Sequence, residues 1–562
     1  MRRPLGSYRR ILALALAAAS APLVGGCGEH AEKTTASFAK STAAPAARSG
    51  EVLSADSYDD DGSPPTPTKS DAPAPAPAAP IAPANPAGET YAKLVENGYR
   101  DPAKQPLSTF SVDVDTASYA NVRRFLTQGM LPPKDAVRVE ELINYFPYAY
   151  PQPTKADEPF SVNVEVSRCP WEDGHRLAKI GLKGREVASD KRPASNLVFL
   201  LDVSGSMQVP NKLPLVKAGL RLLVDHLGEN DRVAIVVYAG STGLALPSTS
   251  CAEKAKILGA LDALHASGST NGAAGLRLAY ETAVGNFIAG GTNRVILCTD
   301  GDFNVGVSDP GELGRLIEAK AKSGVFLSVL GFGMGNYQDK TIERLADKGN
   351  GNAAYIDTLR EANKVLVEQM GGTLLTIAKD VKVQVEFNPA KVASYRLIGY
   401  EDRLLQAKDF NDDKKDAGEI GAGHSVTALY EIVPAGREAH APGVDPLRYA
   451  KPAAAAEGKA DEPAGRELCT VKLRFKPPEG DQSQLIAFAV EDDGTDDHPT
   501  DDFRFAAAVA EFGLLLRDSP FNGQATWDAV LERAESSHGP DPSGYRREFL
   551  DLVRKARTLA GK

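Results

Sequence analysis

The stretch 197–207, with the sequence LVFLLDVSGSM, constrains the fold more than any other part of this chain. Its first five residues are apolar, which is typical of a short strand that is buried on both faces. The run ends in a loop that carries Asp202, Ser204 and Ser206. Open α/β sheets hold their ligand sites at the carboxyl ends of strands. A carboxylate and two hydroxyls at alternate positions can bring their oxygens to one point, and such oxygens suit a hard divalent cation such as Mg2+.

Strand and helix patterns alternate from Asn196 to about Met370. Further strands are predicted at 232–238, 244–246, 294–299, 325–332 and 353–356, with the short one at 244–246 at an edge. Helices are predicted at 213–227, 252–264, 272–287, 310–322, 341–347 and 361–370. This order predicts an α/β fold, with a doubly wound, mainly parallel sheet that has helices on both faces.

Two later loops carry oxygen ligands of the same kind. The turn GSTNG presents the hydroxyl of Thr270, and CTDGD, directly after a buried strand, presents Asp300. In a doubly wound sheet both loops lie at the same end as the first one. The resulting set, Asp202, Ser204, Ser206, Thr270 and Asp300, has only two formal negative charges. A divalent ion held there keeps net positive character, so a carboxylate of a partner can complete its coordination shell.

DVSGSM, GSTNG and TDG, in this order and spacing, resemble the von Willebrand factor A (VWA) domain and its metal-ion-dependent adhesion site. The family pattern D-x-S-x-S, then T, then D, is matched at every position. The resemblance implies that these five residues hold Mg2+, or Mn2+ or Ca2+, and that a protein ligand offers a carboxylate to the metal. Asn271, Asp302 and the loop 240–243 are the candidates for the rim that touches the partner. By analogy with other A domains, the closing helix 361–370 is expected to move when the partner binds.

The first residues indicate export. Four arginines precede an apolar, Ala-rich segment that is too short to span a bilayer permanently, so 1–27 is interpreted as a signal peptide. It closes on LVGGC, which resembles a bacterial lipobox and makes Cys27 the expected lipidated N-terminus. Residues 28–88 are rich in Ala, Pro and Ser and are predicted to form a disordered stalk. The expected location is therefore the cell envelope, at the outer membrane or cell surface, with a lipid as the only membrane anchor. The net charge of -10 argues against nucleic acid as a partner.

Two further regions flank the VWA domain, whose predicted bounds are 191–372. Residues 89–190 are predicted to form an α+β domain, and 373–562 a β-rich module that ends in helices. Segments such as LSTFSVDVDTASYANVRRFL, GGTNRVILCTDGDFNVG and TDDFRFAAAVAEFGLLLRDSPF look like those of the YfbK-type VWA lipoproteins of bacteria. That family combines a VWA-associated domain, a VWA domain and a C-terminal domain of unknown function.

Other functions are less well supported by the residues. No nucleophile–base pair, paired carboxylates or cofactor motif is found, so an enzyme is not expected. One alternative is an envelope scaffold in which the metal only stabilises the fold. A second is a metal-dependent hydrolase, for which Asp302 is the nearby acid outside the motif. Four cysteines besides Cys27 are too far apart in sequence for a zinc pattern, and their pairing stays open, although Cys298 lies in an apolar run and is expected to be a buried thiol.

Overall fold

The structure is a computed structural model that describes the chain from residue 89 onward, with short gaps. The described residues are 89–112, 115–155, 158–188, 192–239, 242–268, 272–301, 310–333, 338–369, 375–415, 417–437, 465–478, 480, 482–492 and 498–561. The predicted signal peptide with Cys27 and the predicted stalk lie outside these ranges. Within them, no helix is long and apolar enough to cross a membrane.

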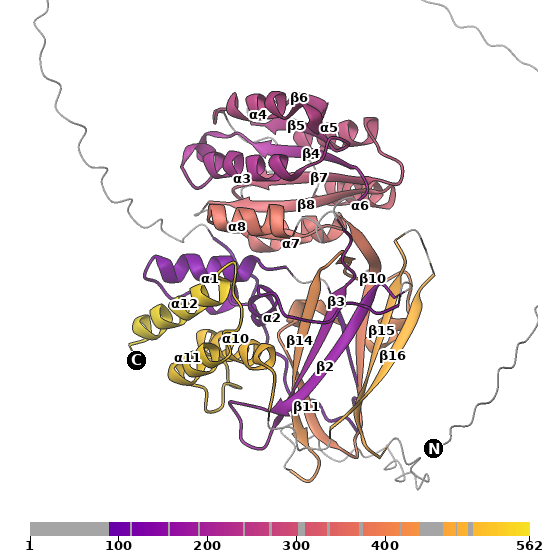
Figure 1. Cartoon of the computed structure of the whole chain (residues 1–562), viewed down its shortest axis with the longest axis vertical. Helices are drawn as coiled ribbons and strands as arrows, with labels where there is room; N and C mark the ends of the chain where they lie inside the picture. Colours follow the sequence, from indigo (N-terminus) through magenta and orange to yellow (C-terminus); the bar gives the residue numbers. More distant parts are fainter. Residues whose placement is uncertain are drawn as a thin grey trace, which may run out of the picture. The chain divides into compact units, whose positions relative to one another are not determined.

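A central α/β domain contains a six-stranded sheet in the order β6-β5-β4-β7-β8-β9 (Figure 1). Its strands are β4 (Ser195–Asp202), β5 (Arg232–Tyr238), β6 (Gly243–Ser250), β7 (Thr292–Thr299), β8 (Val325–Phe332) and β9 (Ala353–Ile356). All neighbouring pairs are parallel except β5 with β6. The sequence prediction of a mainly parallel sheet with an edge strand at 244–246 is therefore confirmed, although this strand, β6, is longer than predicted.

Helices cover both faces of this sheet. They are α3 (Leu213–His226), α4 (Lys254–Asp262), α5 (Gly272–Gly285), α6 (Pro310–Lys322), α7 (Asp339–Lys348) and α8 (Leu359–Asn363). Successive side chains of a strand point to opposite faces, so Phe199 of β4 packs in a core with α3, α4 and α8, and Leu200 packs in a second core with α5, α6 and α7. The closing helix, predicted at 361–370, begins two residues earlier, and only its first half is an α-helix, because α8 continues as a π-helix, η6 (Lys364–Glu368).

The two regions that flank the central domain share a β-sandwich. One sheet has the order β12-β1-β10-β15-β16, with β13 beside β10, and the other has the order β11-β14-β3-β2. The strands are β1 (Leu107–Ser111), β2 (Phe160–Arg168), β3 (Arg176–Gly184), β10 (Thr376–Phe387), β11 (Val392–Ile398), β12 (Leu404–Leu405), β13 (Ile420–Gly421), β14 (Ser425–Pro434), β15 (Glu467–Lys476) and β16 (Gln484–Glu491). Figure 1 shows the early strands β2 and β3 beside the late strand β14. The central domain is thus inserted between two halves of one sandwich.

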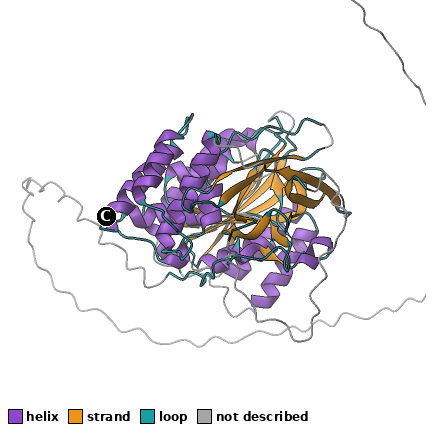
Figure 2. Ribbon diagram, turned by 90° about the horizontal axis from the view of Figure 1, so that it is seen from below, coloured by secondary structure: helices purple, strands orange, loops and turns teal. Residues whose placement is uncertain are grey.

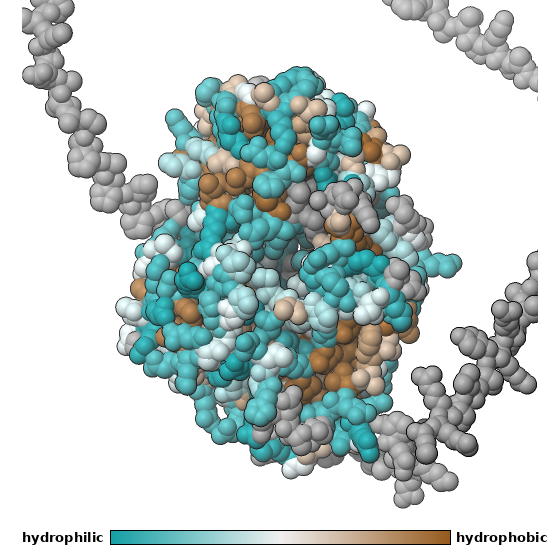
Figure 3. Space-filling view, in the orientation of Figure 1, coloured by the Kyte–Doolittle hydropathy of each residue, from teal (hydrophilic) through white to brown (hydrophobic). Residues whose placement is uncertain are grey.

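Three strands of the sandwich, the two-residue strands β12 and β13 and the longer β16, are not predicted from the sequence. β16 is an edge strand whose apolar run, LIAFAV, lacks the polar alternation by which the other strands are found. Leu485 and Phe488 on it are exposed. In Figure 3 the face in view carries a hydrophobic area over strands of the sandwich and is mostly hydrophilic over the terminal helices.

Helices from both ends of the chain form a further hydrophobic core beside the strands (Figure 2). They are α1 (Ala117–Thr127), α2 (Val139–Asn144), α10 (Asp501–Arg517), α11 (Trp527–Ser536) and α12 (Tyr545–Leu559). α10 is buried over almost its whole length, as expected of a helix that is apolar on all sides. Short 3-10 helices, η2 (Lys134–Ala136), η4 (Gly205–Gln208), η5 (Cys251–Glu253), η7 (Glu401–Arg403) and η8 (Ala407–Asn411), complete the described elements.

All four cysteines after the predicted stalk are free and buried. Cys298 lies within β7 in the hydrophobic core of the central domain, as predicted for a buried thiol.

A buried arginine joins the central domain to the terminal helices. Arg123 of α1 donates to Asp357 after β9 and to Glu361 of α8, at 2.8 Å in each case, and to Glu548 of α12 at 3.0 Å. It also donates to the hydroxyl of Tyr145, which itself donates to Glu361. These contacts, with Lys364 of η6 donating to the carbonyl oxygen of Tyr145, form what we call the Arg123 junction. Burial lowers the pKa of Lys364 to about 7.

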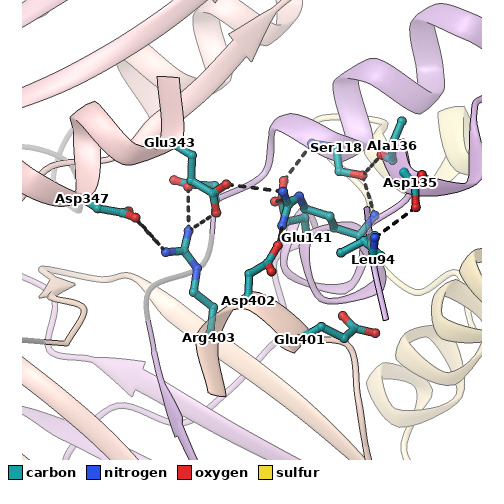
Figure 4. Close-up of polar contacts among 12 residues, drawn as sticks. Leu94, Ser118, Asp135, Ala136, Glu141, Glu343, Asp347, Glu401, Asp402 and Arg403 are labelled. Atoms are coloured by element: carbon teal, nitrogen blue, oxygen red, sulfur yellow. Dashed lines mark hydrogen bonds and ion pairs between the residues drawn. The ribbon is translucent and has the colours of Figure 1, made fainter. Parts of the chain in front are cut away.

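A second group of charges lies against α7 (Figure 4). Arg403 of η7 pairs with Glu343 at 2.6 Å and with Asp347 at 3.2 Å, both on α7. Arg138 also reaches Glu343, at 3.4 Å, and pairs with Asp402 at 2.5 Å. The central domain is therefore held to the rest of the molecule by ion pairs at two of its helices.

We predict that Arg123→Met destabilises the protein by about 3–5 kcal/mol, because it leaves the buried carboxylates of Asp357 and Glu361 without their cation. Urea unfolding of the full chain measures this loss. The matched control is Arg554→Met, which removes a half-exposed arginine that pairs with Glu535 and should cost less than about 1 kcal/mol. Equal effects of the two substitutions would contradict the assigned role of Arg123.

Glu431 of β14 predicts a pH dependence. Burial opposes its ionisation, but His175, which lies 2.7 Å away, and the charge of Arg396 outweigh burial and lower the pKa of Glu431 from 4.5 to about 2. Because the pKa is lower in the folded state, this stabilisation is present above pH 4.5 and is lost as the pH falls toward 2. It corresponds to about 3 kcal/mol. In Glu431→Gln, unfolding free energies measured across this window should depend less steeply on pH, whereas Glu386→Gln, at an exposed ion pair with Lys472, should behave as the wild type.

Candidate metal and partner-binding site

The candidate site begins at the carboxyl end of β4 with Asp202. Its side chain is fully buried, and its Oδ1 accepts a hydrogen bond of 2.8 Å from the backbone N–H of Ser204. Its Oδ2 is buried and has no hydrogen-bond partner among the described residues. Burial raises the pKa of Asp202, and the hydrogen bonds from Ser204 oppose this. The nearby carboxylate of Asp300 raises the pKa further, and the buried side chain of Tyr238 lowers it. A cation at this point would offset both the unfavourable free energy of burying the charged carboxylate and its repulsion from Asp300.

The two serines of the loop present their hydroxyls together. Ser204 Oγ lies 3.0 Å from Ser206 Oγ. Ser204 is buried, whereas Ser206 is exposed, so the pair connects the buried carboxylate with solvent. The loop is held by η4, where the N–H of Met207 donates to the carbonyl oxygen of Ser204 at 3.0 Å. Met207 is fully buried and anchors the loop in the core.

A second loop contacts the serine loop through Ser267 and Gly268, the last residues that are described before the gap at 269–271. The N–H of Ser267 donates to the carbonyl oxygen of Val203, and the N–H of Gly205 donates to that of Gly268, at 3.1 Å. Gly268 has a φ of +83°, which glycine adopts without strain. The next residues, including the predicted Thr270 and Asn271, lie outside the described residues.

Asp300 follows β7, the neighbour of β4 in the sheet. It is 1% exposed, and its Oδ2 lies 2.8 Å from Nζ of Lys212. Asp202 and Asp300 therefore lie at the ends of adjacent parallel strands, as the sequence predicts. Asp302, the other acid of this loop, lies outside the described residues.

Lys212 is a residue that the sequence reasoning missed. It stands directly before α3 and is buried. Its side chain passes over Gly333, where a Cβ would collide with it. Gly333, with a φ of +82°, belongs to the glycine-rich turn after β8. In the sequence, Lys212 is marked only by its position six residues after Ser206. No periodicity distinguishes it from a surface lysine.

The residues present fit a small, hard cation. The donors are two carboxylates and two hydroxyls, which are the oxygen ligands that Mg2+ prefers, and one buried carboxylate oxygen lacks a partner. No group of three His, Cys, Asp or Glu that could hold a metal occurs in the part of the chain that the structure describes. The candidate site has only two acids, Asp202 and Asp300, and serine hydroxyls take the place of a third. Lys212 currently supplies positive charge at Asp300.

Apolar side chains are exposed at the same end of the sheet as the candidate site. Val209, directly after η4, is 46% exposed, and Leu244, at the start of β6, is 45% exposed. Leu244 pairs with Val236 near the carboxyl end of β5. Of the loop 240–243, which was predicted as a rim, Gly240 and Ser241 lie outside the described residues.

The chain is similar to known proteins over most of its length. Residues 196–369 match the model of the von Willebrand factor type A domain, 85–179 match a model described as von Willebrand factor, and 372–559 match that of the C-terminal part of the uncharacterized protein YfbK. The uncharacterized protein YfbK of Escherichia coli strain K12 is 47% identical over 84% of this chain and 82% of its own length. The chain belongs to the YfbK family of VWA proteins. Its central domain is therefore a VWA domain.

More distant proteins are similar over smaller parts. The uncharacterized protein sll0103 of Synechocystis is 28% identical over 33% of this chain and 43% of its own length. Among solved structures, a von Willebrand factor type A protein from Catenulispora acidiphila has a TM-score of 0.38 and 16% identity over 71% of this chain and 91% of that one. BatB from Bacteroides thetaiotaomicron has a TM-score of 0.27 and 20% identity over 32% of this chain and 97% of that one.

We predict that Lys212→Met increases the affinity of the VWA domain for Mg2+ by about tenfold or more, because a like charge a few ångströms away opposes the ion. Calorimetric titration of the full chain with MgCl2 measures the affinity. Lys256→Met, which removes an exposed lysine of α4, should leave it unchanged. Weaker Mg2+ binding in Lys212→Met would instead make Lys212 a support for Asp300.

Proposed function

We propose that this protein is a lipid-anchored component of the cell envelope that binds a protein partner through a divalent cation. Asp202, Ser204, Ser206, Thr270 and Asp300 would hold the ion, with Mg2+ as the first choice and Mn2+ or Ca2+ as alternatives. The observation that carries the proposal is the buried Oδ2 of Asp202. It has no hydrogen-bond partner among the described residues and lies beside paired hydroxyls that open to solvent. The lipid would be attached at Cys27.

The residues of the chain orient this site before any partner arrives. The N–H of Ser204 holds one oxygen of Asp202, so the other oxygen has a fixed direction. A bound cation supplies a Lewis-acidic centre that a partner's carboxylate can ligate. Because only two of the five donors are anionic, the ion keeps net positive charge and selects an acidic residue. Lys212 adds positive charge at the base of the site.

The surface around the site also supports a protein partner. Val209 and Leu244 are exposed apolar side chains at this edge, and apolar contacts around a polar centre are typical of protein interfaces. Asn271 and Asp302 remain rim candidates. We do not assign catalysis to this site, because its two carboxylates, Asp202 and Asp300, serve as ligands of the proposed ion, and the hydrolase alternative rests on Asp302 alone.

The scaffold alternative is favoured by one specific observation. The central domain is tied to the rest of the molecule by the Arg123 junction and by the ion pairs at α7. A metal that only stabilised this assembly would still bind at Asp202. Recognition and scaffolding therefore have to be separated by partner binding rather than by metal binding.

The full chain, immobilised and exposed to envelope extract with Mg2+ or with EDTA, tests the proposal. We expect a protein that is retained only with Mg2+ and is lost in Asp202→Ala. The matched control is Asp225→Ala, at the exposed end of α3, which should retain the same protein. Identical proteins in every arm would reject metal-dependent recognition.

Thr270→Ala separates the two alternatives. Loss of the partner with an unchanged melting temperature supports recognition. A lowered melting temperature in Mg2+ with the partner still bound supports the scaffold.

A further inference from the structure

Arg294 of β7 is a buried cation that forms no ion pair with a carboxylate in the described residues. It is 2% exposed, and it lies in the middle of the sheet, between Leu197 of β4 and Phe326 of β8. Of the described residues, only the hydroxyl of Ser328 accepts a hydrogen bond from its guanidinium, from Nη1 at 2.6 Å. Its Nε has no partner. Burial lowers the pKa of Arg294 to about 10, and Glu419 is the one charge that opposes this effect.

Such an arrangement is costly for a protein. A buried charge is normally paired or held by several hydrogen bonds, because removing it from water is strongly unfavourable. The stacking of the guanidinium near the ring of Phe326, 5.6 Å from its centroid, compensates only in part. Other buried arginines of this chain are paired: Arg123 contacts three carboxylates, and Arg396 pairs with Glu431 at 2.7 Å. Arg294 is therefore an exception among the buried arginines that the structure describes.

The guanidinium borders a cleft that can hold a ligand. The cleft has a volume of about 470 Å³ and is lined by Arg294 and Ser328 from the sheet, by Asn352 before β9, by Lys364 of η6, and by residues of the β13–β14 turn such as His424. This volume is in the range of small-molecule sites. The walls come from both the VWA domain and the sandwich. The cleft lies away from the metal site, since six residues of strand separate Arg294 from Asp300, or roughly 20 Å.

We infer that this cleft binds a small molecule through a carboxylate or a related oxyanion, with Arg294 as the main anion-binding residue. The planar guanidinium has free donors that match the two oxygens of such a group. Ser328 holds Nη1 and so fixes the plane of the fork. Glu368 and Glu419 line the same cleft, so a singly charged carboxylate is favoured over a doubly charged phosphate. A ligand here would contact both the VWA domain and the sandwich.

Thermal unfolding of the full chain in acetate, phosphate and chloride at matched ionic strength tests this inference. We expect acetate to raise the melting temperature of the wild type relative to chloride, and to raise it more per unit of negative charge than phosphate does. In Arg294→Met the acetate-specific shift should disappear. In chloride this variant should be at least as stable as the wild type, because an unpaired buried charge has been replaced by an apolar chain of similar length.

A second variant keeps the test decisive if Arg294→Met does not fold. Ser328→Asp would supply a carboxylate of the chain itself within reach of Nη1 and should also abolish the acetate response. A larger shift in phosphate than in acetate, lost in both variants, would assign the cleft to phosphorylated molecules. An acetate shift of equal size in wild type and variants, or none in the wild type, would overturn the inference.

Discussion

The antiparallel pairing of β1 with β10 is the constraint on which the rest of the structure depends. The two strands pair over five residues, from Leu107 with Glu386 to Ser111 with Lys382, although the whole VWA domain lies between them in the chain. In the other sheet, β14 pairs with β3 over eight residues. Backbone N–H and C=O groups of a buried strand must find partners, so neither flanking region can form its sheets alone. The core of the sandwich accordingly mixes Phe110 and Ile180 with Val383 and Tyr430.

This closure fixes where the VWA domain can leave and rejoin the sandwich. The chain enters the domain after β3 and returns at β10, so both connections begin and end on the same sandwich. Buried ion pairs then hold the domain at α7 and α8. Buried pairs of this kind contribute little net stability, but removing one partner is costly, and they define one geometry over others. The Arg123 junction also contacts the closing helix. This helix packs against α3, the helix that follows the serine loop, where Gly219 leaves room for Ala362 and Leu366.

At the candidate metal site, electrostatics decides more than shape. Burial is the main cause of the raised pKa of Asp202, and repulsion from Asp300 at the adjacent strand end adds to it. Lys212 compensates at Asp300 but leaves Oδ2 of Asp202 without a hydrogen-bond partner. The domain can therefore stay folded around its carboxylates and still offer a cation a favourable position. Arg294, at the other end of the same sheet, is the opposite case, a buried cation that contacts no carboxylate among the described residues.

The sequence by itself was sufficient to predict the order of strands and helices in the central domain and the parallel sheet they form. Its buried strands, such as 325–332, and its helix 310–322 have the predicted bounds, because alternating βαβ units depend on local periodicity and short connections. The positions of Asp202 and Asp300 at neighbouring strand ends could be predicted for the same reason. The tertiary structure alone decided that β1, β2 and β3 share sheets with strands more than two hundred residues later, that Lys212 stands at Asp300, and that Arg294 borders a cleft. These features arise from pairing and burial between distant segments, and the pattern within any one segment contains no information about which distant partner will satisfy its strand edges or its charge.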